Sequence, residues 1–73
     1  MIHRISFTSG NDTKMMCSVG DPDAEFGTCT SIDAEEKPNN MFDITITMEK
    51  ETEDGIQTYQ SFHPYSKLDF IIR

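Results

Sequence analysis

The residues most able to do chemistry in this chain are carboxylates, and the densest group is Asp21-Pro22-Asp23-Ala24-Glu25. Alternating carboxylates of this kind are the ligands of calcium-binding loops. The segment lacks the twelve-residue pattern of such a loop, with its central glycine and closing glutamate. The spacing therefore favours a polar turn, and we expect neither a metal nor another cofactor.

Sulfur and imidazole ligands are also present, as Cys17, Cys29, His3 and His63. These are zinc-ligand types, but the short paired spacings that mark zinc sites are absent. We interpret the two cysteines as free thiols that pack as small apolar side chains. A disulfide would require the strand that carries Cys29 to pair in a ladder with the strand that carries Cys17.

Nothing in the sequence arranges these residues for catalysis. Neither histidine has a nucleophile beside it, and there is no glycine-rich phosphate loop and no nucleophile elbow. A chain of 73 residues with 36% apolar residues has a thin core, which leaves little material to build a catalytic cavity. We therefore expect a single domain, residues 1–73, that is not an enzyme.

Charge is distributed very unevenly along the chain. Eleven of the thirteen acidic residues lie between Asp21 and Asp54, and two lysines there leave a formal charge of -9, against -7 for the whole chain. Such a patch repels nucleic acid and anionic lipid and attracts basic protein surfaces. No apolar run is long enough for a membrane helix, and residues 1–5 do not resemble a signal peptide, so we expect a cytoplasmic product.

Period-two alternation of apolar and polar residues predicts the elements that position these side chains. It indicates an all-β fold, a small antiparallel meander sheet or barrel of five to six short strands. The Asp-x-x-Glu pattern of a capping box allows at most one helical turn, near 33–37. Turn residues separate the strands at 9–12, 20–23 and 63–66. The predicted strands are 2–8, 14–19, 26–32, 41–51 and 67–73, with a return strand after Gly55.

The clearest strand is 41–51, because its even-numbered residues from Phe42 to Met48 are apolar and the residues between them are acidic or hydroxyl-bearing. Glu49, Glu51 and Glu53 then form an acidic row, with Asp43 further along. Alternate residues of a strand are roughly 6.6 Å apart, a spacing that could imitate nucleic acid phosphates. The alternative is a solvated face that only keeps the strand from aggregating.

Hairpin register decides which side chains accompany this row. A three-residue loop, Glu53-Asp54-Gly55, pairs Ile46 with Phe62 and keeps the apolar residues together. It also places Tyr59 opposite Glu49 as an outward aromatic anchor in an acidic surround. In the last strand, Ile71 lies on the face opposite Leu68, Phe70 and Ile72, where either another strand or a partner would cover it.

In length, acidity and the absence of a signal peptide, the chain resembles the inhibitors that phages encode against host nucleic-acid-handling machinery. The resemblance implies an anti-defence or host-takeover factor in the host cytoplasm that occupies a basic, nucleic-acid-binding site of a partner protein. The expected contact residues are Asp43, Glu49, Glu51, Glu53, Asp54 and Tyr59, with a second cluster of Asp21, Asp23, Glu25, Glu35 and Glu36.

A second hypothesis assigns the chain to a different class, a homo-oligomeric structural domain. A thin core and exposed strand edges would then drive self-association through Ile71, with a homodimer as the simplest assembly, and the acidic face would only provide solubility.

Overall fold

Apolar–polar alternation is realised as six antiparallel strands in the computed structural model, which describes residues 1–73. The all-β prediction is confirmed. The only helical element is a single 3-10 turn, η1 (Pro38–Asn40). The strands are β1 (Arg4–Thr8), β2 (Lys14–Ser18), β3 (Pro22–Asp23), β4 (Gly27–Lys37), β5 (Met41–Thr52) and β6 (Gly55–Ile72).

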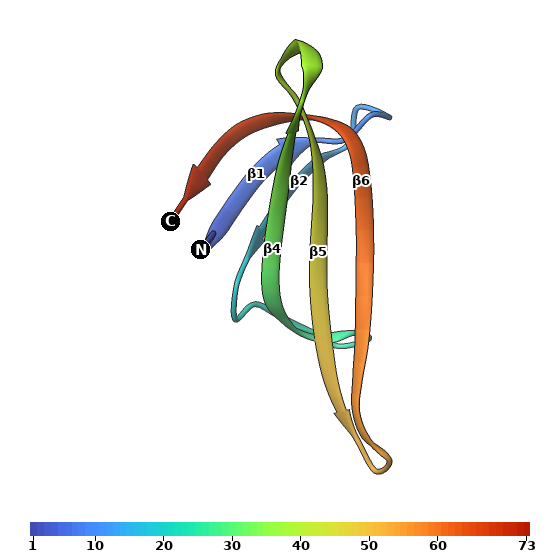
Figure 1. The fold of residues 1–73 in the computed structure, drawn as a ribbon. Helices are drawn as coiled ribbons and strands as arrows, with labels where there is room; N and C mark the ends of the chain where they lie inside the picture. The colour runs from blue at the N-terminus through green and yellow to red at the C-terminus, as the bar shows by residue number, and fades with distance from the viewer.

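The strands form one strongly curled sheet in the order β2-β1-β6-β5-β4-β3. Figure 1 shows β4, β5 and the first part of β6 side by side, with β1 and β2 folded behind them. The buried side chains gather inside the curl: Ile2, Ile5, Phe7, Cys29, Ile32, Ile44 and Ile46. Residues of β4 and β5 that alternate with these buried ones face outward, because successive side chains of a strand point to opposite sides.

Strand β6 holds the two halves of the sheet together. Its first part pairs with β5, and residues from Lys67 onward pair with β1. Figure 1 shows it running beside β5 and then curving over to end near the N-terminus. The predicted turn at 63–66 is therefore wrong, because the chain bends there without reversing. Tyr65 takes a positive φ of 50° at the bend, and the Ser66 hydroxyl donates to the His63 carbonyl oxygen at 3.0 Å.

The two edges of the curled sheet meet at a seam. The chain leaves β2 and directly forms β3, which pairs with the start of β4. Between them, the Gly20 amide donates to the Cys29 carbonyl oxygen at 2.8 Å, and the Cys29 amide donates to the Asp21 carbonyl oxygen at 3.0 Å. These bonds satisfy backbone groups of Cys29 that would otherwise be buried without partners. The seam therefore consists of a few backbone bonds centred on Cys29.

The helical turn lies just after its predicted position. Residues 33–37 continue β4, so the Asp-x-x-Glu capping box does not form there, and the turn falls at Pro38–Asn40. Ile32 pairs with Ile46 and Ala34 pairs with Ile44 on the core side of the sheet. This packing extends the ladder through the predicted helical segment, because cross-strand apolar pairs outweigh a local capping signal.

At the end of β6, the side chains that face the core are not the ones predicted. A register shift opposite Ser6 and Phe7 places Ile71 opposite Ile5, so Ile71 packs against the core. Phe70 and Ile72, predicted to be inside, are 40% and 48% exposed. Ile71 is therefore poorly placed to form an oligomer interface. A single-residue bulge inverts every later side chain, and alternation alone does not reveal it.

Gly27, at the start of β4, provides a sharp test of the close packing between β4 and β5. Its φ is +90°, and a Cβ built there would overlap the carbonyl oxygen of Glu49. Gly27→Ala should therefore lower the free energy of unfolding by about 3 kcal/mol or more, from backbone strain and overlap together. Gly55→Ala is the matched control, because Gly55 has φ +115° and open space around it; only the strain, about 1–2 kcal/mol, should appear. Urea unfolding followed by circular dichroism measures both, and equal losses would contradict the packing at Gly27.

Candidate protein-binding surface

The outer side of β4 and β5 gathers five carboxylates, which we call the convex acidic face: Asp33, Glu35, Asp43, Glu49 and Glu51. Glu35 lies directly opposite Asp43 on the neighbouring strand, and Asp33 lies opposite Thr45. Three residues of the first predicted set, Asp43, Glu49 and Glu51, therefore lie on this face. Glu35 of the second predicted cluster joins them. Lys37 is the only cation on this side of the two strands, so the face is strongly negative.

The β5–β6 hairpin has a different register from the predicted one. Thr52 pairs with Gly55, so the loop is the two residues Glu53 and Asp54, and Ile46 pairs with Ser61. The Thr52 hydroxyl accepts the Asp54 amide at 3.3 Å and donates to the Gly55 carbonyl oxygen at 2.8 Å. The prediction of a three-residue loop is therefore wrong. Glu53 lies with Asp54 at the hairpin tip and does not continue the acidic row.

The register of this hairpin also decides which aromatic side chain lies beside the acidic residues. Tyr59 pairs with Met48 on the inner side, so its predicted outward position opposite Glu49 is wrong. Phe62 instead pairs with Thr45, and Ile56 pairs with Glu51, on the convex acidic face. Phe62 is 61% exposed and Ile56 is 67% exposed. The face therefore combines carboxylates with large apolar side chains that the fold leaves in solvent.

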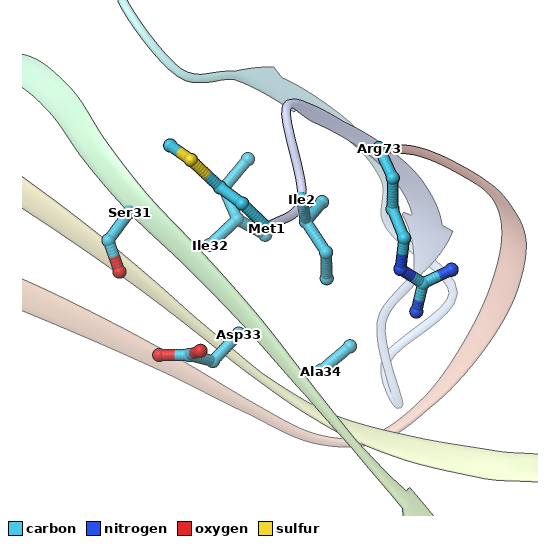
Figure 2. Close-up of a pocket in the computed structure, with 7 residues that line it drawn as sticks. All are labelled: Met1, Ile2, Ser31, Ile32, Asp33, Ala34 and Arg73. Carbon is cyan, nitrogen blue, oxygen red and sulfur yellow. The ribbon is translucent and has the colours of Figure 1, made fainter.

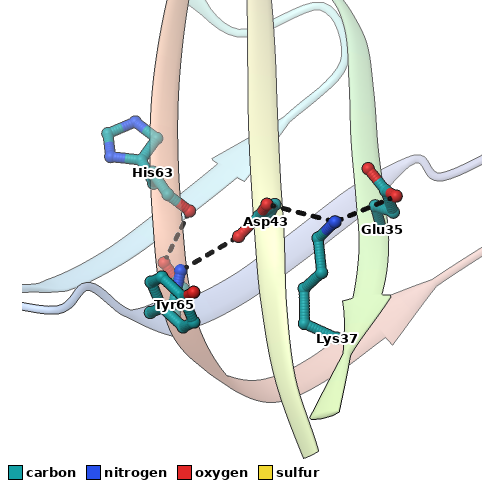
Figure 3. Close-up of polar contacts among 6 residues, drawn as sticks. Glu35, Lys37, Asp43, His63 and Tyr65 are labelled. Carbon is teal, nitrogen blue, oxygen red and sulfur yellow. Dashed lines mark hydrogen bonds and ion pairs between the residues drawn. The ribbon is translucent and has the colours of Figure 1, made fainter.

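Asp43 connects this face to the bend in β6. Its Oδ1 accepts the Tyr65 backbone amide at 3.1 Å, and its Oδ2 lies 3.7 Å from Lys37 Nζ. Lys37 Nζ also lies 3.2 Å from Glu35 Oε1, as Figure 3 shows. The hydrogen bond to Glu35 raises the pKa of Lys37 above its ordinary value. Asp43 thus has a structural role that Glu49 and Glu51 lack.

Of the second predicted cluster, only Glu35 lies on the convex acidic face. Asp21 accepts the Ser18 amide at 3.0 Å, and Asp23 accepts the amides of Glu25 and Phe26 at 2.8 and 2.9 Å. The amide of Phe26, followed by that of Glu25, holds the pKa of Asp23 below its ordinary value. Both aspartates therefore stabilise the turn before β4. Glu25 is exposed in that turn, and Glu36 is exposed on the other side of β4, opposite Phe42.

Inside the curl lies a cavity of about 710 Å³, which sequence reasoning missed because only closure of the sheet creates it. Tyr59 lines it, with its ring 5.3 Å from that of Phe26 in an edge-on arrangement. Cys17 and Cys29 also line it, together with three methionines. A smaller hollow of about 300 Å³ lies where Met1, Ile2 and Arg73 meet β4 (Figure 2).

The histidines stand apart from the thiols. His63 lies on the inner side of β6, with its ring 5.3 Å from that of Phe7 and its Nε2 3.1 Å from the Ser61 hydroxyl. Burial lowers its pKa below the ordinary value for histidine. No three side chains of histidine, cysteine, aspartate or glutamate lie close enough together to share a metal ion.

Comparison with known protein families, curated proteins and solved structures finds no match. None of the helical structure is long and apolar enough to cross a membrane. The fold and its surface define a small all-β protein with a curled antiparallel sheet and an acidic outer side.

Removing the Asp43 carboxylate tests its structural role. Asp43→Ala should lower the free energy of unfolding by about 1–2 kcal/mol, because the Tyr65 amide loses its acceptor at the bend. Glu35→Ala is the control, since Glu35 contacts only the exposed end of Lys37 and such a surface pair contributes about 0.5 kcal/mol or less. Urea titration of both variants measures the difference. Equal losses would show that the hydrogen bond at the bend adds nothing.

Proposed function

We propose that this protein is a non-enzymatic inhibitor that uses the convex acidic face to occupy a basic, nucleic-acid-binding site of a partner protein. The observation that carries the proposal is the gathering of five carboxylates on two neighbouring strands beside the exposed Phe62. The partner is a protein with a Lys- and Arg-rich groove, and the phage-type setting that the chain's size and charge imply would place the complex in the host cytoplasm.

Geometry makes the carboxylates act together on such a groove. Alternate residues such as Glu49 and Glu51 are roughly 6.6 Å apart along a strand, and neighbouring strands are about 4.8 Å apart. Both spacings fall within the Debye length of about 8 Å at physiological salt, so the fields of adjacent carboxylates add. This convex array of negative charge presents to a cationic groove what a nucleic acid backbone presents to it.

Apolar side chains on the same face supply the second part of an interface. Phe62 and Ile56 are mostly exposed beside Thr45 and Glu51. Exposed aromatic and aliphatic residues within a charged surround are typical of the small group of side chains that contribute most of the binding energy. Charge would guide and orient the partner, and these two side chains would lose their contact with water in the complex.

Charge reversal at two sites, with the same net change, tests this assignment. Glu49→Lys/Glu51→Lys changes the convex acidic face, and Glu53→Lys/Asp54→Lys changes the hairpin tip by the same amount. Affinity capture from bacterial lysate should recover a basic nucleic-acid-binding protein with the wild-type chain and the tip variant, and about 100-fold less with the face variant, because close charge pairs would become repulsive. Duplex DNA or RNA should displace the captured protein, and raising the salt concentration should release it.

Three results would contradict the proposal. Equal loss in both variants would show that only net charge matters. Capture that is insensitive to salt and to added nucleic acid would remove the competitive mechanism. An unchanged interaction in the face variant would exclude this surface as the binding site.

Self-association is a second candidate function, favoured by an apolar patch on the outer side of β1, β2 and β6. Met16 and Phe70 lie on either side of Ser6 on the neighbouring strands and are 59% and 40% exposed. Ser6 itself is buried, and its hydroxyl donates to Asp69 Oδ2 at 3.2 Å. Ile72 lies opposite Arg4 in the next row and is 48% exposed. A second copy of the chain could cover this patch, with the acidic half of each molecule keeping the assembly soluble.

Sedimentation velocity separates this candidate from the first. If the patch is an interface, the wild-type protein should sediment as a dimer at micromolar concentration at both low and high salt, because apolar burial is little screened. Phe70→Lys/Ile72→Lys should then sediment as a monomer. A wild-type monomer at both salt concentrations would leave the patch without a role in assembly.

A further inference from the structure

The two cysteines meet at the seam of the curled sheet, although their strands are not ladder neighbours. Cys17 lies on β2 and Cys29 on β4, and their Sγ atoms are 3.4 Å apart, with the Cys17 thiol donating to the sulfur of Cys29. The backbone of Cys29 is fixed by its bonds to Gly20 and Asp21. The sequence allows a disulfide only if these two strands pair in a ladder. They do not pair, and closure of the curl brings the two sulfurs together instead.

We infer that Cys17 and Cys29 form a redox modification site, in which an external disulfide such as oxidised glutathione converts the thiol pair to an intramolecular disulfide that locks the seam. The geometry requires only that two sulfurs already in contact move to bonding distance, about 2.05 Å. Because both backbones are held by neighbouring strands, small rotations of the two side chains suffice.

The different solvent exposure of the two thiols sets the order of the two exchange steps. Cys17 is half-buried and lines the open cavity, whereas Cys29 is 1% exposed. The Cys17 thiolate attacks glutathione disulfide, forming a mixed disulfide and releasing one glutathione thiolate. The Cys29 thiolate then attacks the Cys17 sulfur and releases the second glutathione. Two protein thiols are oxidised, one glutathione disulfide is reduced to two glutathione thiols, and the two protons lost by the cysteines balance the products.

Burial, followed by the neighbouring Cys29, raises the pKa of Cys17 to about 12. The thiolate is the attacking species, so the reaction is slow at neutral pH and accelerates as the pH rises. The site therefore stays reduced under brief exposure to oxidant and closes under sustained exposure.

The effect of closure depends on the bonds that the seam already contains. The reduced seam is held by the short β3 pairing and by the two backbone bonds of Cys29. A covalent link encloses the eleven residues between the cysteines and so restricts the unfolded chain. The same link fixes the wall of the large cavity that both cysteines line.

Prolonged reaction of the full chain with oxidised glutathione at pH of about 8.5, where the Cys17 thiolate is more populated than at neutral pH, tests the site. Intact mass should show a monomer that has lost two hydrogen atoms and carries no glutathione. Its melting temperature should be roughly 10 °C higher than that of the reduced protein, and dithiothreitol should reverse both changes. Cys17→Ser, which nearly keeps the size of the half-buried side chain but removes its sulfur, should show neither change.

Several outcomes would overturn the inference. They are unreacted thiols after prolonged oxidation, a stable glutathione adduct without ring closure, or disulfide-linked dimers. An oxidised monomer whose melting temperature is unchanged or lower would refute the locking of the seam. If the serine variant fails to fold, the mass measurement on the wild-type protein still tests the inference. None of these results depends on the identity of a binding partner.

Discussion

The bend in β6 is the constraint on which the rest of the structure depends. One strand of eighteen residues serves as ladder partner to β5 along its first part and to β1 along its second part. The bend at Pro64 and Tyr65 redirects the ladder, and Asp43 receives the Tyr65 amide that the bend removes from regular pairing. Curling then brings the two edges of the sheet, at β2 and β3, together, which creates the seam at Cys29 and the cavity beside it.

Strand locations could be predicted from the sequence wherever alternation is strong. Residues 42–48 alternate cleanly, and the strand is found there, because burial on one face selects a single periodicity. The hairpin of β1 and β2 is equally well signalled by its turn residues. Alternation could not show the bulges near Ser6, Cys29 and Phe42, since an extra residue leaves the local pattern intact and shifts only the later residues of the strand.

The surface is harder to predict than the fold, because it depends on register. Burial of Phe62 would favour the three-residue loop. However, the part of β6 opposite Met48 faces an open cavity, where turning an apolar side chain inward removes little of its surface from water. The Thr52 hydroxyl bonds then favour the shorter loop. That difference of one residue turns Tyr59 inward and Phe62 outward. The clustering of acidic residues is visible in the sequence, but their division between two faces and two turns is not.

The acidic residues also differ in whether they form hydrogen bonds that stabilise the fold. Asp21, Asp23 and Asp43 each accept backbone amides, so their charges contribute to turns and to the bend. Asp33 and Glu51 make no comparable contact, and Glu49 receives only a 3.4 Å bond from Thr30. Like charges on adjacent positions oppose folding. Folding alone does not explain why they stand together beside an exposed phenylalanine, and a cationic partner surface would convert their repulsion into attraction.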